Sequence, residues 1–410
     1  MKKTILILTL MIGSLAGTNA QNGKPHIPHD LEEAMQWNDI DLVIGTYGEH
    51  LYIYNLDCKT LEFTLKAKAE AKNASYALAE AGQIFAVSEV GDGSGAYSFQ
   101  LNKAAADEAA ADKVADGGMT IQMTADRRQT GADPCFAIVY TGAYIGPHLM
   151  TSDYSGGSVS VFPIANGKIG ERVEQICFEG SGPVEGRQES SHIHQLKAIP
   201  GADGYILASD LGADVIRLLK TGRGEGTSEV PGTLKLTHIE DIECPAGSGP
   251  RHMEFSANGR MLYCIAELSG EVLAYKVSGK KKPAFKLVQR IQADEVNAGG
   301  SADIHMDPSG QWLYTSHRLE NDGISVFKVL KDGKLEKIGY AHTGRHPRNF
   351  MITPDGKLLI VACRDDRSIQ MFRIEPDGTL TQTPGMLTFT DDMPSSVVAI
   401  PHFEKHIFVL

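Results

Sequence analysis

One sequence pattern recurs along most of the chain, and this repetition constrains the fold more than any other feature. In its clearest copy, apolar segments flank the turn at Asn258-Gly259, and two more run over 271–277 and 285–292. Short apolar or alternating segments separated by Asn-Gly and Ser-Gly turns are typical of strands joined by hairpins. Each copy therefore predicts four antiparallel strands.

Equivalent positions of the repeat can be counted seven times, at intervals of 45 to 59 residues. These anchor positions are Ser75, Pro134, His192, Pro250, Ala302, Pro347 and Pro394. Four strands at such a period are typical of propeller blades. We therefore predict an all-β protein, a seven-bladed β-propeller of four-stranded antiparallel blades. Two unrelated β domains are the alternative, which the unbroken period disfavours.

The last copy ends at Leu410 and leaves room for about two strands. Segments 41–47 and 50–54 are predicted to supply the missing outer strands, so that N- and C-terminal strands close one blade. Closure of this kind removes a sheet edge that would otherwise favour aggregation. The propeller domain is predicted over 41–410, with the Ala-rich stretch 103–118 as an excursion inside the first full blade.

The N-terminus predicts export. Lys2-Lys3 precede an apolar run, 5–15, that is too short to span a bilayer, and small residues at 18–20 are suitable for cleavage. We interpret 1–20 as a signal peptide and 21–40 as a short lead segment, with a membrane anchor as the alternative. No later stretch reaches membrane length. We therefore expect a soluble periplasmic or secreted protein, and a monomer.

Charge and cysteine content exclude several kinds of partner. The net charge of −12, with no basic block, is unsuited to a nucleic acid or an anionic membrane. The six cysteines form no metal-ligand motif, and Cys264 and Cys363 are predicted to be buried free thiols. No cofactor is predicted. His192 and His194 share one face of a strand, but the sequence supplies no third ligand, so we predict no metal site.

The hairpin register predicts which polar residues meet. Arg251 and Glu267 each stand eight residues from Gly259, which makes them cross-strand neighbours at the open end of the hairpin. Because the first strand of every propeller blade lines the central channel, these ends should meet around one mouth. Counting eight residues to either side of Gly310 pairs Ala302 with Arg318, and the same count from Gly356 pairs Arg348 with Arg364.

Acidic residues and histidines are expected to join this mouth. The equivalent strand-end positions in earlier blades are Glu89, Asp153 and Asp210, although strand-end carboxylates also cap turns. Tyr47 and Tyr154 are expected there as aromatic residues, together with His192, His194 and His252. Four further histidines are predicted to be solvent-facing or turn residues: His305, His317, His342 and His346. Arginine binds planar anions and histidine exchanges protons near neutral pH, so the mouth predicts a small anionic ligand.

At these motifs the chain resembles a known family. Gly247-Ser-Gly-Pro-Arg-His252, the segment 153–162, Asp210-Leu-Gly-Ala-Asp214 and Gly180-Ser-Gly-Pro183 are similar to the lactonase-type seven-bladed propellers. That family includes propeller 6-phosphogluconolactonases and the fungal carboxymuconate cyclase. The resemblance runs from about residue 41 to the C-terminus and implies four catalytic residues, His194, Arg251, Glu267 and Arg318. The chain departs from the family pattern at Ser191-His-Ile-His194, where the family commonly has Pro-His-Pro-His, and at Phe136, where it has His.

The resulting hypothesis is a metal-free hydrolase of a small anionic sugar lactone, resembling 6-phosphogluconolactonase. Arg251 and Arg318 would hold anionic groups and stabilise the oxyanion, His194 would move the proton, and Glu267 would orient Arg251 or the histidine. The residues expected to bind substrate are His192, His252, Tyr154 and Arg348. The predicted export favours an unphosphorylated lactone. Two alternatives stay open: a lactonising cyclase of the carboxymuconate type, and a non-catalytic propeller that binds an anionic ligand or a glycan.

Overall fold

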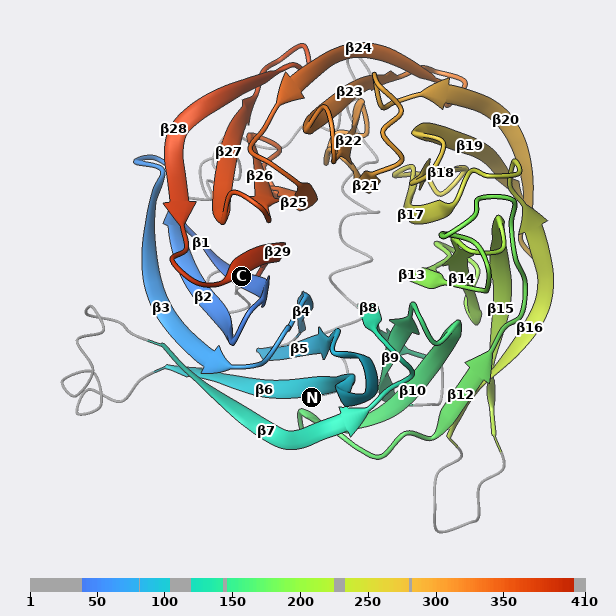
Figure 1. The fold of residues 1–410 in the computed structure, drawn as a ribbon, viewed down its shortest axis with the longest axis horizontal. Coiled ribbons are helices and arrows are strands. Elements are labelled where there is room, and N and C mark those ends of the chain that lie inside the picture. Colours follow the sequence, from blue (N-terminus) through green and yellow to red (C-terminus); the bar gives the residue numbers. More distant parts are fainter. Residues whose placement is uncertain are drawn as a thin grey trace, which may run out of the picture. The chain divides into compact units, whose positions relative to one another are not determined.

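The computed structural model describes residues 39–80, 82–103, 119–142, 146–224, 233–279 and 282–401. Seven antiparallel sheets are arranged as blades around a central axis (Figure 1). The predicted all-β propeller is therefore confirmed, and the alternative of two unrelated β domains is wrong. Within the described residues, no helix has the length and hydropathy needed to cross a bilayer. The predicted signal peptide, the lead segment up to residue 38 and most of the Ala-rich stretch lie outside the described residues.

Six blades are built from consecutive strands. The first three blades comprise β4 (Tyr76–Glu80), β5 (Gln83–Ser88), β6 (Gly95–Lys103) and β7 (Met119–Gln129); β8 (Pro134–Thr141), β9 (Pro147–Asp153), β10 (Ser158–Ala165), the short β11 (Lys168–Ile169) and β12 (Glu174–Cys177); and β13 (Ile193–Ala198), β14 (Tyr205–Asp210), β15 (Val215–Arg223) and β16 (Leu234–Glu243). The next three comprise β17 (Pro250–Phe255), β18 (Met261–Ala266), β19 (Glu271–Ser278) and β20 (Ala284–Gln292); β21 (Ser301–Met306), β22 (Trp312–His317), β23 (Gly323–Val329) and β24 (Leu335–His342); and β25 (Pro347–Ile352), β26 (Leu358–Cys363), β27 (Ser368–Ile374) and β28 (Leu380–Thr388).

The remaining blade joins the two ends of the domain, as predicted, but with a different division of strands. Its order is β29 (Met393–Ala399), β1 (Asp39–Tyr47), β2 (His50–Asp57) and β3 (Glu62–Glu70). The described C-terminal part thus supplies one strand and the N-terminal part three, where two and two were expected. The segment 62–70 was missed because its side chains are mostly exposed, so it lacks the apolar run used to recognise a strand.

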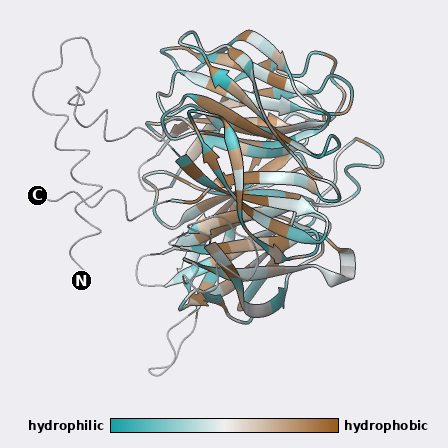
Figure 2. Cartoon of the chain, turned by 90° about the vertical axis from the view of Figure 1, so that its left-hand side faces the viewer, coloured by the Kyte–Doolittle hydropathy of each residue, from teal (hydrophilic) through white to brown (hydrophobic). Residues whose placement is uncertain are grey.

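Neighbouring blades are held together by apolar faces. One core cluster combines Leu207 and Ile216 of one blade with Met253 and Leu262 of the next. Sheets that twist around a common axis can bury both faces in this way, and apolar burial is the main driving force for such packing. In Figure 2 the hydrophobic segments lie along the strands, with hydrophilic residues in many of the connecting loops.

The fit is tight where the ring closes. A Cβ atom added to Gly45 of β1 would lie 2.5 Å from the backbone oxygen of Ala74 in the next blade. Glycine is therefore required there by close approach of backbone. Strand β1 pairs with β29 through matches such as Ile44 with Val397, and this pairing leaves no free edge between the ends of the domain.

Candidate active site

Register irregularities at the inner strands aim side chains into the mouth. Between β17 and β18, Pro250 pairs with Ala266 and His252 pairs with Ile265, so Arg251 is an extra residue in a β-bulge. A bulge re-aims a side chain and is common beside active sites. The equivalent shifts in other blades occur at Cys135, His194, Ala302–Asp303, Arg348 and Ser395. The hairpin count placed Arg251 at the right end of its strand, but the predicted pairs Arg251–Glu267, Ala302–Arg318 and Arg348–Arg364 are wrong. The hairpins are not centred on their glycines, and the bulges add a further shift.

These bulged residues form a first ring of side chains, and a second ring stands where the strand beside each inner strand ends. Its members are Tyr47, Glu89, Tyr154, Leu211, Glu267, Arg318 and Arg364. The expected positions Asp153 and Asp210 are therefore wrong by one residue. Successive side chains in a strand point to opposite faces, so this shift turns both carboxylates into the blade. Asp153 accepts hydrogen bonds from three hydroxyl groups, and Asp210 forms a buried ion pair of 2.7 Å with Arg217.

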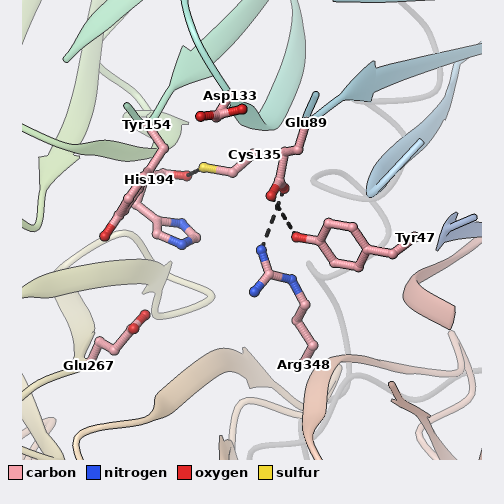
Figure 3. A pocket seen from close by; sticks show the side chains of 8 residues that line it. All are labelled: Tyr47, Glu89, Asp133, Cys135, Tyr154, His194, Glu267 and Arg348. Carbon is pink, nitrogen blue, oxygen red and sulfur yellow. Dashed lines mark hydrogen bonds and ion pairs between the residues drawn. The ribbon is translucent and has the colours of Figure 1, made fainter. Parts of the chain in front are cut away.

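The two rings enclose a pocket of about 240 Å³ (Figure 3). Its lining residues come from six blades and one connecting loop, and they are Tyr47, Glu89, Asp133, Cys135, Tyr154, His194, Glu267 and Arg348. In this view Glu267 and Arg348 come from below and Glu89 from above, where it meets the Arg348 guanidinium, and the His194 imidazole projects toward the centre from the left. Of the predicted catalytic residues, His194 and Glu267 line this pocket directly.

Glu267 gathers three arginines. Its carboxylate lies 2.6 Å from Arg187, 2.7 Å from Arg251 and 3.2 Å from Arg318, although only 7% of the residue is exposed. Burial alone would raise the pKa of Glu267, but the three guanidinium groups outweigh it and lower the pKa to about 2. The predicted contact of Glu267 with Arg251 is present, and the carboxylate is ionised at neutral pH.

Arg251 and Arg318 lie behind the carboxylate, where each also contacts other protein groups. Arg251 donates to the backbone oxygen of Ala302, and Arg318 donates to that of Gly300 at 2.7 Å and contacts His346 at 3.3 Å. Burial lowers the pKa of Arg318 to about 9, opposed by Glu267 and reinforced by the other arginines. Both side chains support the pocket wall and contribute positive charge.

Arg348 presents more free donor capacity. Among the described residues, its guanidinium has one polar contact, at 3.4 Å from Glu89, and it lies 5.2 Å above the Tyr47 ring. Glu89 is already satisfied by the hydroxyl groups of Tyr47 and Ser75, each at 2.6 Å. Since a guanidinium has five N–H donors, Arg348 can offer several to a bound anion.

Two buried histidines stand next to each other at the pocket. The rings of His194 and His252 are 5.0 Å apart between centroids, and Nδ1 of His252 lies 2.7 Å from Asp303. Burial and the charge of Arg251 hold the pKa of His194 well below its usual range and lower that of His252 to about 4. Both rings are therefore neutral near pH 7. His194 can accept a proton in that state.

The other predicted substrate-binding residues lie at the rim. The Tyr154 and His192 rings stack at 4.4 Å with an interplanar angle of 8°. Tyr154 also meets the edge of His194 at 5.6 Å. His192 points onto Tyr154, whereas His194 lies at the pocket wall, so the two histidines do not converge on one point. In the described ranges, no three His, Cys, Asp or Glu side chains gather closely enough to hold a metal.

One of the four remaining histidines contradicts the expectation. His317 is fully buried, with its two ring nitrogens each 2.8 Å from a hydroxyl, of Ser301 and Thr315, so the prediction of a solvent-facing residue is wrong. His346 is a turn residue with φ of 61°, but it is buried against Arg318. His305 is partly exposed and contacts Asp303, and His342 is exposed as expected. Cys264 and Cys363 are buried and free, as predicted.

Sequence reasoning missed Arg187 and Cys135. Arg187 comes from the loop between β12 and β13, which is anchored by the buried Gln188. No strand pattern marks this loop, so only its position in space reveals the contact with Glu267. Cys135 follows the anchor Pro134 just as Arg251 follows Pro250. Alignment of the repeats on these anchors could have identified it.

The Glu267 cluster predicts a dependence of stability on pH. The folded-state pKa of about 2 lies below the ordinary value of 4.5, so the stabilisation is present above pH 4.5 and is lost as the pH falls toward 2. The shift corresponds to about 3 kcal/mol. We expect the difference in unfolding free energy between the natural protein and Glu267→Gln to shrink between pH 5 and pH 3 in denaturant titrations. A difference independent of pH in this window would contradict the ionised carboxylate.

Comparison with known proteins adds information about ancestry. A family model described as Lactonase, 7-bladed beta-propeller, matches residues 41–391. A protein named 6-phosphogluconolactonase from Formosa agariphila is 37% identical over 245 residues, which cover 58% of this chain and 67% of that protein.

Solved structures agree in fold. A crystal structure from Bacteroides fragilis, provisionally described as a 6-phosphogluconolactonase, has a TM-score of 0.78 and 33% identity and covers 90% of this chain and 99% of that one. A periplasmic gluconolactonase from Pseudomonas aeruginosa has a TM-score of 0.70 over 88% of this chain and 99% of its own, and at 23% identity it shows likeness of fold alone.

Proposed function

The chain belongs to the seven-bladed β-propeller lactonase family, and from this premise we propose that it hydrolyses a small anionic sugar lactone in the pocket between His194 and Arg348. The resemblance recognised in the motifs is thereby confirmed at the level of the family. Lactone hydrolysis is the activity that its relatives' names support.

The observation that carries the proposal is the surplus of positive charge at the mouth. In a chain of net charge −12, these arginines surround one pocket: Arg187, Arg251, Arg318, Arg348 and Arg364. The acidic side chains that contact them or line the pocket number one fewer, namely Glu89, Asp133, Glu267 and Asp365. Buried charge of one sign needs compensation, and an anionic ligand would supply it.

The chemistry assigns separate roles to the lining residues. A water molecule attacks the lactone carbonyl while Nε2 of His194 takes its proton, and Arg348 donates hydrogen bonds to the oxyanion that forms. The ring C–O bond then breaks, and the alkoxide recovers the proton from His194 to give a hydroxy acid. Donors placed on a developing oxyanion and one positioned base are established sources of rate acceleration. Arg251 and Arg318 hold Glu267 and maintain the positive field.

Substrate binding would also adjust the base. The arginines that depress the pKa of His194 are partly neutralised when an anion enters, so the proton affinity of the imidazole rises in the complex. The stacked Tyr154–His192 pair offers a flat apolar face to a sugar ring. Relatives named 6-phosphogluconolactonase support a phosphorylated lactone, whereas the N-terminal export pattern supports an unphosphorylated aldonolactone or uronate-derived lactone outside the cytoplasm.

Hydrolysis of 6-phosphogluconolactone and gluconolactone by the purified protein tests the proposal, with spontaneous opening subtracted. Arg348→Ala is expected to lower kcat/KM at least 100-fold, because it removes charged donors from the oxyanion. Arg290→Ala is the matched control, since Arg290 is a half-exposed arginine whose partner is Glu271. The ratio of the two rates identifies whether phosphate is recognised.

Two results would overturn the assignment. Absence of turnover of either lactone by folded protein would leave the cyclase and the binding module as the explanations. Turnover that Arg348→Ala and Arg290→Ala reduce equally would place the reaction elsewhere.

A further inference from the structure

Two neighbouring ring nitrogens are buried without a hydrogen-bond partner. They are Nδ1 of His194 and Nε2 of His252, and each residue is 4% exposed. Buried polar atoms in proteins are nearly always hydrogen-bonded, so an exception needs a physical account. Here the two exceptions belong to imidazoles that touch, with planes at 71° and centroids 5.0 Å apart.

The separation of the rings suits a direct N–H···N hydrogen bond. Such a bond places its heavy atoms about 3 Å apart, and the ring radii on both sides bring the centroids to roughly 5 Å. One nitrogen must donate and the other must accept.

The direction of this bond follows from Asp303. Its carboxylate lies 2.7 Å from Nδ1 of His252 and can only accept while ionised, so His252 carries its proton on Nδ1. The remaining nitrogen, Nε2, is then an acceptor in the neutral ring. His194 must donate to it through Nδ1, and this leaves Nε2 of His194 without a proton. The His194 ring points into the pocket in Figure 3.

Asp303 is itself held firmly. Its second oxygen lies 3.0 Å from Nε2 of His305 and accepts from the side chain of Asn349 and the backbone of Phe350. Burial would raise the pKa of Asp303, but His305 and His252 hold it well below its usual range. Asp303 can therefore act as a fixed anionic acceptor on β21.

We propose that Asp303, His252 and His194 form a hydrogen-bonded chain that keeps the proton of His194 on Nδ1 and leaves its Nε2 as the proton acceptor toward the pocket. The inference rests on the proposed function and identifies Asp303 and His252 as positioning residues. When water attacks, its proton moves to Nε2 of His194, and the Nδ1–H bond to His252 stays intact until the alkoxide takes the proton back.

Charged groups surround the chain unevenly. Arg251, Arg318 and Arg348 face His194, while Arg251 and His305 face His252. Asp303 contributes the carboxylate hydrogen-bonded to His252, and His305 links it to Glu254 at 3.7 Å and onward to Lys197. The arginines disfavour a positive charge on His194. The hydrogen bonds that run from His194 through His252 to the Asp303 carboxylate act in the opposite direction and favour it.

The tautomers can be measured without substrate. In protein carrying ¹⁵N-labelled histidine, His194 and His252 are expected to be protonated on Nδ1 and bare on Nε2 near pH 7.5, with assignments from His194→Gln and His252→Gln. Asp303→Asn should give a mixture of tautomers at both rings. Protonation of His194 on Nε2 in the natural protein would overturn the proposed hydrogen-bonded series. Unchanged tautomers of His194 and His252 in the folded Asp303→Asn variant would overturn it as well. This test is independent of lactone hydrolysis.

Kinetics test what the chain does for the reaction. His252→Phe keeps a ring of similar shape but removes the acceptor, and kcat is expected to fall about 10-fold to 100-fold while KM changes less than about threefold. His252→Gln can both accept and donate, so it should recover part of the loss.

His238→Gln is the matched control, because His238 forms a 2.7 Å pair with Asp241 on the exposed strand β16. An unchanged kcat in His252→Phe would overturn the positioning role. If the natural protein hydrolyses neither lactone, the proposed function fails while the tautomer measurement still decides whether the chain exists.

Discussion

His194→Gln is expected to lower kcat for lactone hydrolysis by about 10²-fold to 10⁴-fold, the range of a positioned general base. Glutamine is similar in size and polarity but cannot accept a proton near neutral pH. His194 is only 4% exposed and lies at the pocket wall, so water from bulk solvent cannot easily take over its role as the base. Steady-state hydrolysis of whichever lactone the natural protein opens faster provides the measurement.

The control for this variant is another buried histidine. His148 on β9 lies outside the pocket lining and contacts the backbone of Gly146 at 2.8 Å. His148→Gln should retain kcat within about twofold, even where it costs some stability. A loss below 10-fold in His194→Gln would show that His194 does not act as the base, and water activation would then have to come from another lining group.

Glu267→Gln is expected to cost about 3–5 kcal/mol of unfolding free energy, the effect of breaking a buried ion pair. The amide cannot balance three guanidinium groups that lie within 3.2 Å of the carboxylate. The same change should loosen the wall that carries the positive field and reduce kcat/KM together with stability. Denaturant unfolding at pH 7 measures the first effect, and lactone hydrolysis at a temperature where the variant is folded measures the second.

Glu271→Gln separates the special environment of Glu267 from the loss of a charge. Glu271 lies four residues away on β19 and pairs with the half-exposed Arg290 at 2.8 Å. Exposed pairs of this kind contribute about 0–1 kcal/mol, so the control should remain close to the natural protein. Equal losses of unfolding free energy in Glu267→Gln and Glu271→Gln would mean that other groups balance the charge of the arginines around Glu267.

Which end of each later hairpin reaches the mouth was predictable because the position of a turn is a local property, whereas the predicted pairs were displaced, since Pro250 pairs with Ala266 and Pro347 with Cys363. Gly259, Gly310 and Gly356 have φ values from 66° to 70°, and a left-handed residue of this kind marks the turn at which each hairpin reverses. In the earlier blades the turns are less regular, so the same arithmetic selected Asp153 where the mouth residue is Tyr154. An error of one residue reverses the face of a strand.

The sequence by itself determined the architecture and the chemical character of the mouth. A repeat of four short strands cannot bury its apolar faces alone, and stacking seven copies around an axis satisfies all of them, which brings the inner strand ends together. The tertiary structure alone decided the contacts within that mouth. Arg187 and Glu267 are 80 residues apart and belong to a loop and a different blade, and His252 meets Asp303 across two blades. Such contacts depend on bulges and on the direction of side chains after the ring has closed, which no local periodicity encodes.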